Sequence, residues 1–525
     1  MWIFLRASLI FFSLALIAAP STLAARLQFA PYGLKTEQHG THAAEIAWLD
    51  VPVRHGEPNG AKLRLRIVRL RAPEAARSHA PIIYFAGGPG GSGVGTARGA
   101  RWPIFDRMRQ HGDVLLFDQR GTGESSVPPA CPHQAALALG REAQLASQIA
   151  TAKRCVQFWR EQKLDLAAFN TVESAHDVNA LRLALAVPKL TLWGMSYGTH
   201  LASSVMRLHG EHIERAILMG YEGPPDTYKF PLVADQMLAQ IEALAQLDPK
   251  LPTEFKPVLE NIRKLLAKLE RQSITASLLR SSGEITIGKF EAQLGISVML
   301  TRSDFVRHIP LAIGSALKGE AGLLAEYVQG AQLGRREFSA MPLAMDIASG
   351  ANIERMVIIN AQTPQSVLGD ALNFPLPDLT AELGIPDLGD DFRAPLISLV
   401  PTLFVTGTLD VRTPPANTLA ALPGFSAASQ LIIMGAGHDN DLWLSLPETA
   451  DTLEAFVQNR WQGVKRLQMP TVEFATSLSN ELWRDLKNSL GLPALSLILM
   501  CLIVLPVALL WWWRRRRMAR RARTL

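Results

Sequence analysis

Short apolar runs recur along the chain, and most of them end at a glycine-rich turn or a polar residue. Several are followed by helical periodicity, and this alternation is typical of a mostly parallel sheet flanked by helices. The first two runs alternate apolar and polar residues and predict an antiparallel hairpin, whereas the later runs suit strands covered on both faces. The predicted strands are Ala44–Val53, Leu63–Leu70, Ile82–Ala86, Val114–Asp118, Leu190–Trp193, Ala216–Met219, Thr402–Thr406 and Gln430–Met434.

The pattern changes over residues 224–395. Helical periodicity is clear in Leu232–Leu247 and Val258–Leu269, and no convincing strand follows within this region. We therefore expect an α/β core formed by residues 26–223 and 396–465, interrupted by a helical cap.

The first 25 residues have the pattern of a secretory signal peptide. Arg6 precedes an apolar run from Ala7 to Ala19, and small residues suited to cleavage end at Ala24 and Ala25. Because the run is shorter than the ~20 residues that a membrane span needs, a cleaved signal is favoured over an uncleaved anchor.

A second apolar segment, Gly491–Trp513, has 23 uncharged residues and predicts a transmembrane helix. The tryptophans Trp511–Trp513 are placed like an interfacial belt, and seven arginines follow in residues 514–525. The positive-inside rule then predicts a cytoplasmic tail and a periplasmic or extracellular catalytic part, joined to the span by a linker at 466–490. A buried core helix with a solvated basic tail is the alternative.

The arginine tail also explains the net charge of +6. Without Arg6 and the seven tail arginines, 45 Lys and Arg face 47 Asp and Glu. This near-neutral balance favours no nucleic-acid partner, and the 48% apolar, 19% charged composition excludes wholesale disorder.

The three cysteines fit an exported protein. Cys501 lies in the predicted span, which leaves Cys131 and Cys155 for a disulfide in an oxidising compartment. Closing that loop would contribute roughly 3 kcal/mol in the chain-entropy treatment. Two buried free thiols are the alternative.

The strongest chemical signal is the segment Gly194-Met-Ser-Tyr-Gly198, which follows an apolar strand and precedes a helical stretch. Where a strand turns sharply into a helix, a Cβ two residues before or after the serine would clash, and the turn exposes the serine. We predict Ser196 as a nucleophile and the Tyr197 N–H as an oxyanion donor.

A nucleophilic serine needs a base and an orienting carboxylate, in the chain order Ser, Asp or Glu, His. Asp410 follows the strand Thr402–Thr406, and His438 follows the strand Gln430–Met434. Both loops lie past the carboxyl ends of strands, where an open α/β sheet gathers its site. We predict these two as the partners of Ser196; ordinary loop residues are the alternative.

The turn Gly87-Gly-Pro-Gly-Gly-Ser-Gly93 follows another predicted strand. Its backbone N–H groups can approach a carbonyl oxygen, so it predicts the second half of an oxyanion hole, with Gly88 chosen over Gly90 without a geometric reason. A phosphate-binding loop is the competing interpretation, but the turn lacks a Gly-Lys-Ser/Thr ending and the dinucleotide glycine spacing.

Four motifs occur in order within about residues 80–225 and 398–460. They are Phe85-Ala-Gly-Gly-Pro-Gly-Gly-Ser-Gly93, Asp118-Gln-Arg-Gly-Thr-Gly-Glu-Ser125, Trp193-Gly-Met-Ser-Tyr-Gly-Thr199 and Gly407-Thr-Leu-Asp-Val-Arg-Thr-Pro414. Together they resemble the proline-iminopeptidase and tripeptidyl-aminopeptidase family of α/β-hydrolases. The resemblance implies a serine peptidase that acts on peptide N-termini beneath a helical cap. Ala86 stands where the proline-iminopeptidase pattern has His, which is more similar to the exported tripeptidyl-type members.

Other charged residues have weaker signals. An aminopeptidase must bind a cationic amine, and Glu222, after the strand Ala216–Met219, and Asp346, in the insertion, are the candidates. Asp118 and Arg120 are interpreted as a pair that supports the loops.

The sequence thus predicts an exported, membrane-tethered serine hydrolase that forms an acyl-enzyme on Ser196, with no metal or cofactor implied. Peptides are the substrates that the resemblance implies. An ester hydrolase with the same triad is the alternative, and a non-catalytic binding module is the alternative of another class, against which the complete triad argues.

Overall fold

The computed structural model describes residues 26–481 and 484. Its main feature is a ten-stranded sheet in the order β1-β2-β3-β5-β4-β6-β7-β10-β11-β12. The strands are β1 (Ala30–Lys35), β2 (Thr41–Pro52), β3 (Lys62–Leu70), β4 (Ile82–Phe85), β5 (Val114–Phe117), β6 (Leu190–Met195), β7 (Ile213–Met219), β10 (Thr402–Gly407), β11 (Ala428–Met434) and β12 (Val464–Gln468).

The pairing confirms a mostly parallel sheet with an antiparallel start. β1, β2, β3 and β5 pair antiparallel, and from β5 to β12 every neighbouring pair is parallel. The central strands β4 and β5 are buried along their whole length, as their uninterrupted apolar runs require. All eight predicted strands are present, with ends shifted by a few residues.

The predictions missed the strands at the two edges of the sheet. β1 contains Pro31 and Gly33, which weaken a strand signal, and β12 has the charged sequence Val-Lys-Arg-Leu-Gln. Edge strands bury only part of one face, so few apolar residues mark them. The core therefore extends past the boundary predicted at 465, because β12 ends at Gln468.

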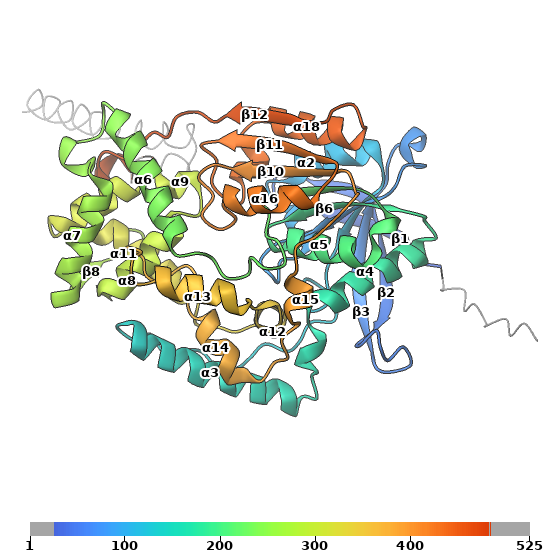
Figure 1. The fold of residues 1–525 in the computed structure, drawn as a ribbon, viewed down its shortest axis with the longest axis horizontal. Helices are drawn as coiled ribbons and strands as arrows, with labels where there is room; N and C mark the ends of the chain where they lie inside the picture. The colour runs from blue at the N-terminus through green and yellow to red at the C-terminus, as the bar shows by residue number, and fades with distance from the viewer. Residues whose placement is uncertain (1–25, 482–483, 485–525) are drawn as a thin grey trace, which may run out of the picture.

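Helices cover both faces of the sheet (Figure 1). One face packs against α4 (Thr171–Leu185), α5 (Tyr197–His209) and α16 (Pro415–Ala421), and the other against α1 (Gly93–Arg98), α2 (Trp102–Met108) and α18 (Pro447–Val457). The carboxyl ends of β10 and β11 point toward the inserted helices (Figure 1).

The chain between β7 and β10 forms an insertion that has a hydrophobic core of its own. This core is built from α6 (Leu232–Leu247), α7 (Val258–Arg271), α8 (Lys289–Met299), α10 (Ile309–Leu317) and α11 (Gly322–Leu333). The expectation of no strand here was wrong, because β8 (Ile274–Ser277) and β9 (Glu284–Ile287) form a small antiparallel hairpin. The hairpin is short and mostly exposed, so it lacks the apolar run that marks a buried strand.

The helix α3 (Arg141–Glu161) belongs to the first part of the core in sequence but joins the insertion in space. Its apolar residues share one cluster with the sheet helices and with α12 (Ala340–Ser349) and α14 (Leu376–Leu383) of the insertion. Figure 1 shows α3 beside α14. A disulfide between Cys131 and Cys155 ties this helix to the chain that precedes it.

The described chain after β12 packs onto the insertion. Phe474 and Ala475 are buried in the insertion core, and Glu481 accepts a hydrogen bond from Arg307 at 2.9 Å. Up to residue 481, this packing differs from the juxtamembrane linker predicted at 466–490. The apolar contacts of Phe474 and the ion pair of Glu481 explain why the chain after β12 packs against the insertion.

Within residues 26–481 and 484, no helix combines the length and apolar character needed to cross a bilayer. The predicted signal peptide (1–25), span (491–513) and basic tail (514–525) lie outside the described residues.

Candidate active site

Ser196 lies in the sharp turn between β6 and α5. Its φ of 54° falls in the left-handed region, which a residue with a side chain rarely adopts. A Cβ on Gly194 would lie 2.4 Å from the carbonyl oxygen of Gly198, and a Cβ on Gly198 would lie 2.1 Å from that of Phe85. Both glycines are therefore required for the turn that presents the serine.

The structure brings Ser196, His438 and Asp410 together in one chain of hydrogen bonds. His438 Nε2 is 3.0 Å from Ser196 Oγ, and His438 Nδ1 is 2.7 Å from Asp410 Oδ2. The three residues follow β6, β11 and β10, so they gather at the carboxyl edge of the sheet. In this arrangement the imidazole can take the serine proton while the carboxylate holds the Nδ1–H.

The neighbours of Asp410 favour its ionised form. Asp410 is fully buried, and its Oδ1 accepts the N–H groups of Arg412 and Thr413, both at 2.8 Å. Burial alone would raise the pKa of this carboxyl. The charge of His438 and the hydrogen bonds from His438 and Thr413 outweigh burial and hold the pKa below its usual value. Asp410 is thus favoured in its ionised form, which can stabilise an imidazolium.

The glycine-rich turn after β4 lies against the nucleophile. A Cβ on Gly87 would be 2.9 Å from the Cβ of Ser196, so the backbone approaches the serine at this position. Gly88 and Gly90 have φ values of 126° and 104°, which favour glycine. The N–H groups of Gly88 and Tyr197 stay the predicted oxyanion donors. The predictions missed the close approach of the backbone to Ser196 at Gly87, although the run of glycines in this turn indicated it.

Asp118 and Arg120 support the loops around this site, as predicted from the sequence, but each bonds to other residues and not to the other member of the pair. Asp118 accepts hydrogen bonds from the Ser92 hydroxyl at 2.6 Å and the Val94 N–H at 3.2 Å, which joins the glycine-rich turn to the end of β5. Arg120 is fully buried and donates two hydrogen bonds of 2.7 Å to Asp177 on α4. The expected Asp118–Arg120 pair was therefore wrong, because the two side chains point to different elements.

Glu222 lies just past β7, buried beside the start of α5. Its N–H donates to the Thr199 hydroxyl at 2.8 Å, and its Oε2 is 2.7 Å from Lys229 Nζ. Burial would raise the pKa of Glu222, but the charges of Lys229 and His200 lower it more, so the pKa lies below its usual value. Glu222 is therefore a buried anion close to the nucleophile helix.

Asp346 reaches the same region from α12 of the insertion. Pro342 on this helix packs against the glycine-rich turn, where a Cβ on Gly90 would lie 2.6 Å from Pro342 Cγ. Burial, and then the negative charge of Glu222, raise the pKa of Asp346 to about 8. Among the described residues, no ion pair or side-chain hydrogen bond joins the Asp346 carboxyl to a partner. Glu222 and Asp346, the two predicted amine-binding residues, therefore lie near each other. The carboxyl oxygens of Asp346 remain able to accept hydrogen bonds.

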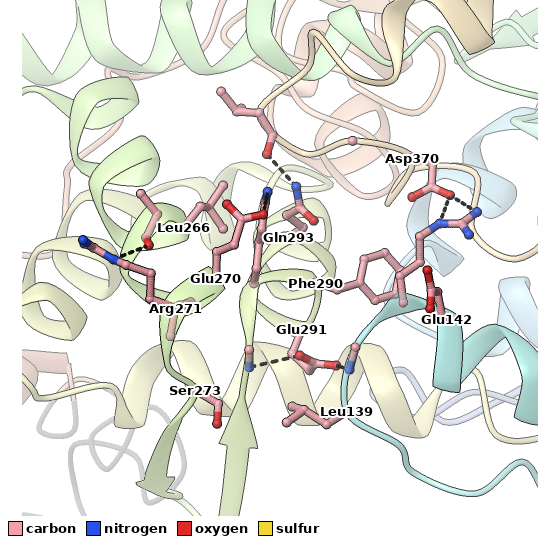
Figure 2. Close-up of a pocket in the computed structure, with 18 of the residues that line it drawn as sticks. Leu139, Glu142, Leu266, Glu270, Arg271, Ser273, Phe290, Glu291, Gln293 and Asp370 are labelled. Carbon is pink, nitrogen blue, oxygen red and sulfur yellow. Dashed lines mark hydrogen bonds and ion pairs between the residues drawn. The ribbon is translucent and has the colours of Figure 1, made fainter.

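A pocket of about 990 Å³ lies elsewhere, between α3, α7 and α8 (Figure 2). Glu291 lies within it and accepts the N–H groups of Gly140 at 2.8 Å and Gly288 at 3.0 Å. Arg141 donates to Asp370 at one side of the pocket at 2.7 Å. Backbone N–H groups satisfy Glu291 and Asp370 pairs with Arg141, and none of the triad residues lines the pocket. The candidate active site is therefore the triad at the sheet edge.

Comparison with known proteins agrees with this architecture. Residues 80–256 match the family described as "alpha/beta hydrolase fold". The chain has this fold. The matched segment includes the glycine-rich turn and Ser196 and ends before Asp410.

Two of the curated relatives each match about a third of the chain. A tripeptidyl aminopeptidase of Streptomyces coelicolor is 29% identical over 196 residues, which cover 34% of this chain and 35% of the relative. The serine protease Hip1 of Mycobacterium tuberculosis is 30% identical over 188 residues, again 34% of this chain and 35% of the relative. The chain thus matches these relatives over about a third of their length.

A solved thermophilic esterase from Thermogutta terrifontis is 15% identical, with a TM-score of 0.33, and the alignment covers 82% of this chain and 99% of the esterase. This similarity is too low to indicate a function.

Proposed function

We propose that the protein is a serine hydrolase that removes residues or short peptides from the N-termini of peptides. The observation that carries the proposal is the hydrogen-bonded chain from Ser196 Oγ through His438 to the buried Asp410. The names of the two relatives, a tripeptidyl aminopeptidase and a serine protease, support a peptide substrate.

The triad geometry supports a two-step reaction. Ser196 Oγ attacks the carbonyl carbon of the scissile bond while His438 Nε2 takes the serine proton, and the N–H groups of Gly88 and Tyr197 stabilise the oxyanion. His438 then gives this proton to the leaving amine, the C–N bond breaks, and the N-terminal part of the substrate stays as an ester on Ser196. Water loses a proton to His438 and attacks the ester; His438 then gives this proton to Ser196 Oγ as the C–O bond breaks, which releases the N-terminal product as a carboxylic acid and restores the serine.

An aminopeptidase also needs an anionic site for the substrate ammonium, and we assign this role to Glu222 and Asp346. Asp346, with a pKa of about 8, is mostly protonated at neutral pH. A bound ammonium would lower this pKa and favour loss of the proton. The ammonium of a free N-terminus would therefore favour ionisation of Asp346 as the substrate binds.

We also propose that the catalytic part is exported and is tethered by residues 491–513. The disulfide between Cys131 and Cys155 supports an oxidising compartment. Truncation at Ser489 should release the protein from washed membranes, and an ectodomain that stays bound would contradict a purely C-terminal anchor.

The test of the enzyme class uses a fluorophosphonate probe on the full chain. Wild type should be labelled, Ser196→Ala should not, and the control Ser204→Ala, on the same helix, should be labelled normally. Labelling that persists in Ser196→Ala would contradict the nucleophile assignment, and an unlabelled wild type would favour a binding module.

The substrate test compares free tripeptidyl anilides, their N-acetylated forms and short nitrophenyl esters. A peptidase that acts on N-termini should cleave the free anilides and lose activity when the amine is acetylated. Equal cleavage of both anilides, or turnover of the esters alone, would favour the ester hydrolase, because a triad does not distinguish an ester from an amide.

A further inference from the structure

The loop that carries His438 is bonded to the insertion as well as to the core. The backbone N–H of His438 donates to the carbonyl oxygen of Thr301 at 2.9 Å. Thr301 lies between α8 and the short helix α9 (Ser303–Val306), and Figure 1 shows α9 beside the carboxyl ends of β10 and β11. The insertion therefore contacts the backbone of the predicted general base directly.

Asp441 strengthens this contact from the end of the same loop. It begins α17 (Asp441–Leu444), and its side chain is 8% exposed. Its Oδ2 accepts the N–H groups of Ser303 and Gly437 at 2.8 Å each, and its Oδ1 accepts the Ser303 hydroxyl at 2.8 Å. The Asp441 carboxylate thus links Gly437, the residue before His438, to Ser303, which lies 138 positions before Asp441 in the chain.

The His438 loop and the loop between α8 and α9 pack closely against each other. A Cβ on Gly437 would lie 2.9 Å from Asp441 Oδ2 and 3.2 Å from the Cα of Arg302. The two backbones therefore touch where Gly437 has no side chain, and a shift of the α8–α9 loop must be transmitted to the His438 loop.

The core holds the opposite side of the loop. Arg101, at the start of α2, donates from Nε to the side-chain oxygen of Asn440 at 2.9 Å and pairs with Asp439. Its guanidinium also lies 4.9 Å from the ring centre of Trp443. The outer part of the loop is thus fixed by the core, whereas the backbone of His438 is bonded to the insertion and its side chain to Asp410 of the core.

We propose that Asp441 and Ser303 position His438, so that the insertion is part of the catalytic machinery and does more than cover the site. The proposal rests on the proposed function, because it assumes that His438 is the general base. Asp441 acts through the loop and does not touch the substrate. A misplacement of about 1 Å in a reacting group costs on the order of 100-fold in rate, which is the size of effect to expect here.

The test compares two changes at Asp441 in the full chain. Asp441→Ala removes every acceptor and should lower kcat on the order of 100-fold, with KM within about 2-fold. Asp441→Asn can keep all three contacts, because its oxygen can accept both N–H groups while its amide donates to the Ser303 hydroxyl. It should lose less than about 3-fold in kcat. The matched control is Asp304→Ala, an exposed acid on α9 that pairs with Arg302, which should behave like wild type.

Ser303→Ala provides a second variant in case Asp441→Ala does not fold. It removes one hydroxyl and should lower kcat about 5-fold, and Ser303→Thr, which restores the hydroxyl, should recover the rate. An equal loss in Asp441→Asn and Asp441→Ala, an unchanged kcat in a folded Ser303→Ala, or a comparable loss in Asp304→Ala would each overturn the proposal.

The rate of fluorophosphonate labelling separates the two proposals. It should fall in Asp441→Ala together with kcat, because labelling uses the same base. If wild type is labelled and Asp441→Ala is labelled equally fast, the positioning proposal fails and the hydrolase assignment stands. If wild type is not labelled at all, the hydrolase assignment itself fails.

Discussion

The triad and the predicted amine site are assembled in different ways. Ser196, Asp410 and His438 each follow the end of a parallel strand, so the sheet brings them to one edge, and the insertion adds its contacts to the His438 loop. Glu222 depends on its contact with Lys229, and Asp346 depends on how a helix of the insertion packs onto the core. The comparison teaches that the sheet gathers the triad, whereas the predicted amine site depends on how the insertion packs onto the core.

The largest expected effect tests the sheet-edge group. Asp410→Asn keeps the shape of the side chain but cannot hold the His438 tautomer, so kcat should fall about 10⁴-fold for peptide and ester substrates alike. Activity assays on both substrates check this. The control is Asp451→Asn, an exposed acid that pairs with Arg107, and it should be active. A loss confined to peptides would mean that Asp410 acts in recognition.

Loss of the disulfide should have the next largest effect, on stability. The double change Cys131→Ser and Cys155→Ser should lower the free energy of unfolding by about 3 kcal/mol, because the unfolded chain regains the freedom of the closed loop. Denaturant titration measures the loss. Reduction should destabilise wild type by a similar amount and leave the double variant unchanged. A reduced wild type as stable as the oxidised protein would contradict the prediction.

Glu222→Gln should separate recognition from chemistry. Removing this charge weakens the ammonium site, so kcat/KM for free peptides should fall about 30-fold, roughly 2 kcal/mol, while turnover of small esters should change little. Glu260→Gln, at an exposed acid on α7 that pairs with Lys264, is the control for charge. Equal losses on both substrate classes would place Glu222 with the catalytic groups and break the comparison.

The smallest expected effect is a pH dependence of stability. Because the folded pKa of Asp346 is about 8, the folded state holds this proton more tightly than the unfolded chain, and stability falls as the pH rises from about 4 to 8. Asp346→Asn removes the effect and should melt about 2 °C higher than wild type at pH 8, with a smaller advantage at pH 5. Thermal melts at both values check this. The exposed Asp391→Asn should show no such trend, and an advantage that grows toward pH 5 would contradict the raised pKa.

The parts of the molecule that could be predicted from the sequence are those with local signals. The turn at Ser196 needs a strand, two glycines and a helix within a few residues, and α6 has apolar periodicity over its whole length, Leu232–Leu247. A loop after a strand likewise indicated Asp410 and His438 without any knowledge of the insertion. These features depend on neighbours in the chain, so a single sequence contains them.

The parts that could not be predicted depend on contacts between distant segments. Nothing in the sequence joins Thr301 to His438 or assigns Arg120 to Asp177, because each pairing follows from the packed arrangement of several elements. The edge strand β12 was missed for a related reason. Its adjacent charged residues, Lys465 and Arg466, are held by pairing with β11 and not by an apolar face of the strand.

The position of the insertion has a consequence for folding. β10 pairs with β7, with Thr402 opposite Ala216, so the sheet can be completed only after the whole intervening chain has been made. Pairing over such a separation is slow compared with local folding. Because Ser196 precedes both partners in the chain, we expect its turn to form before Asp410 and His438 dock at the open edge of β7. We therefore expect the serine to lack its base until β10 and β11 pair with the sheet, and the chain to acquire activity only then.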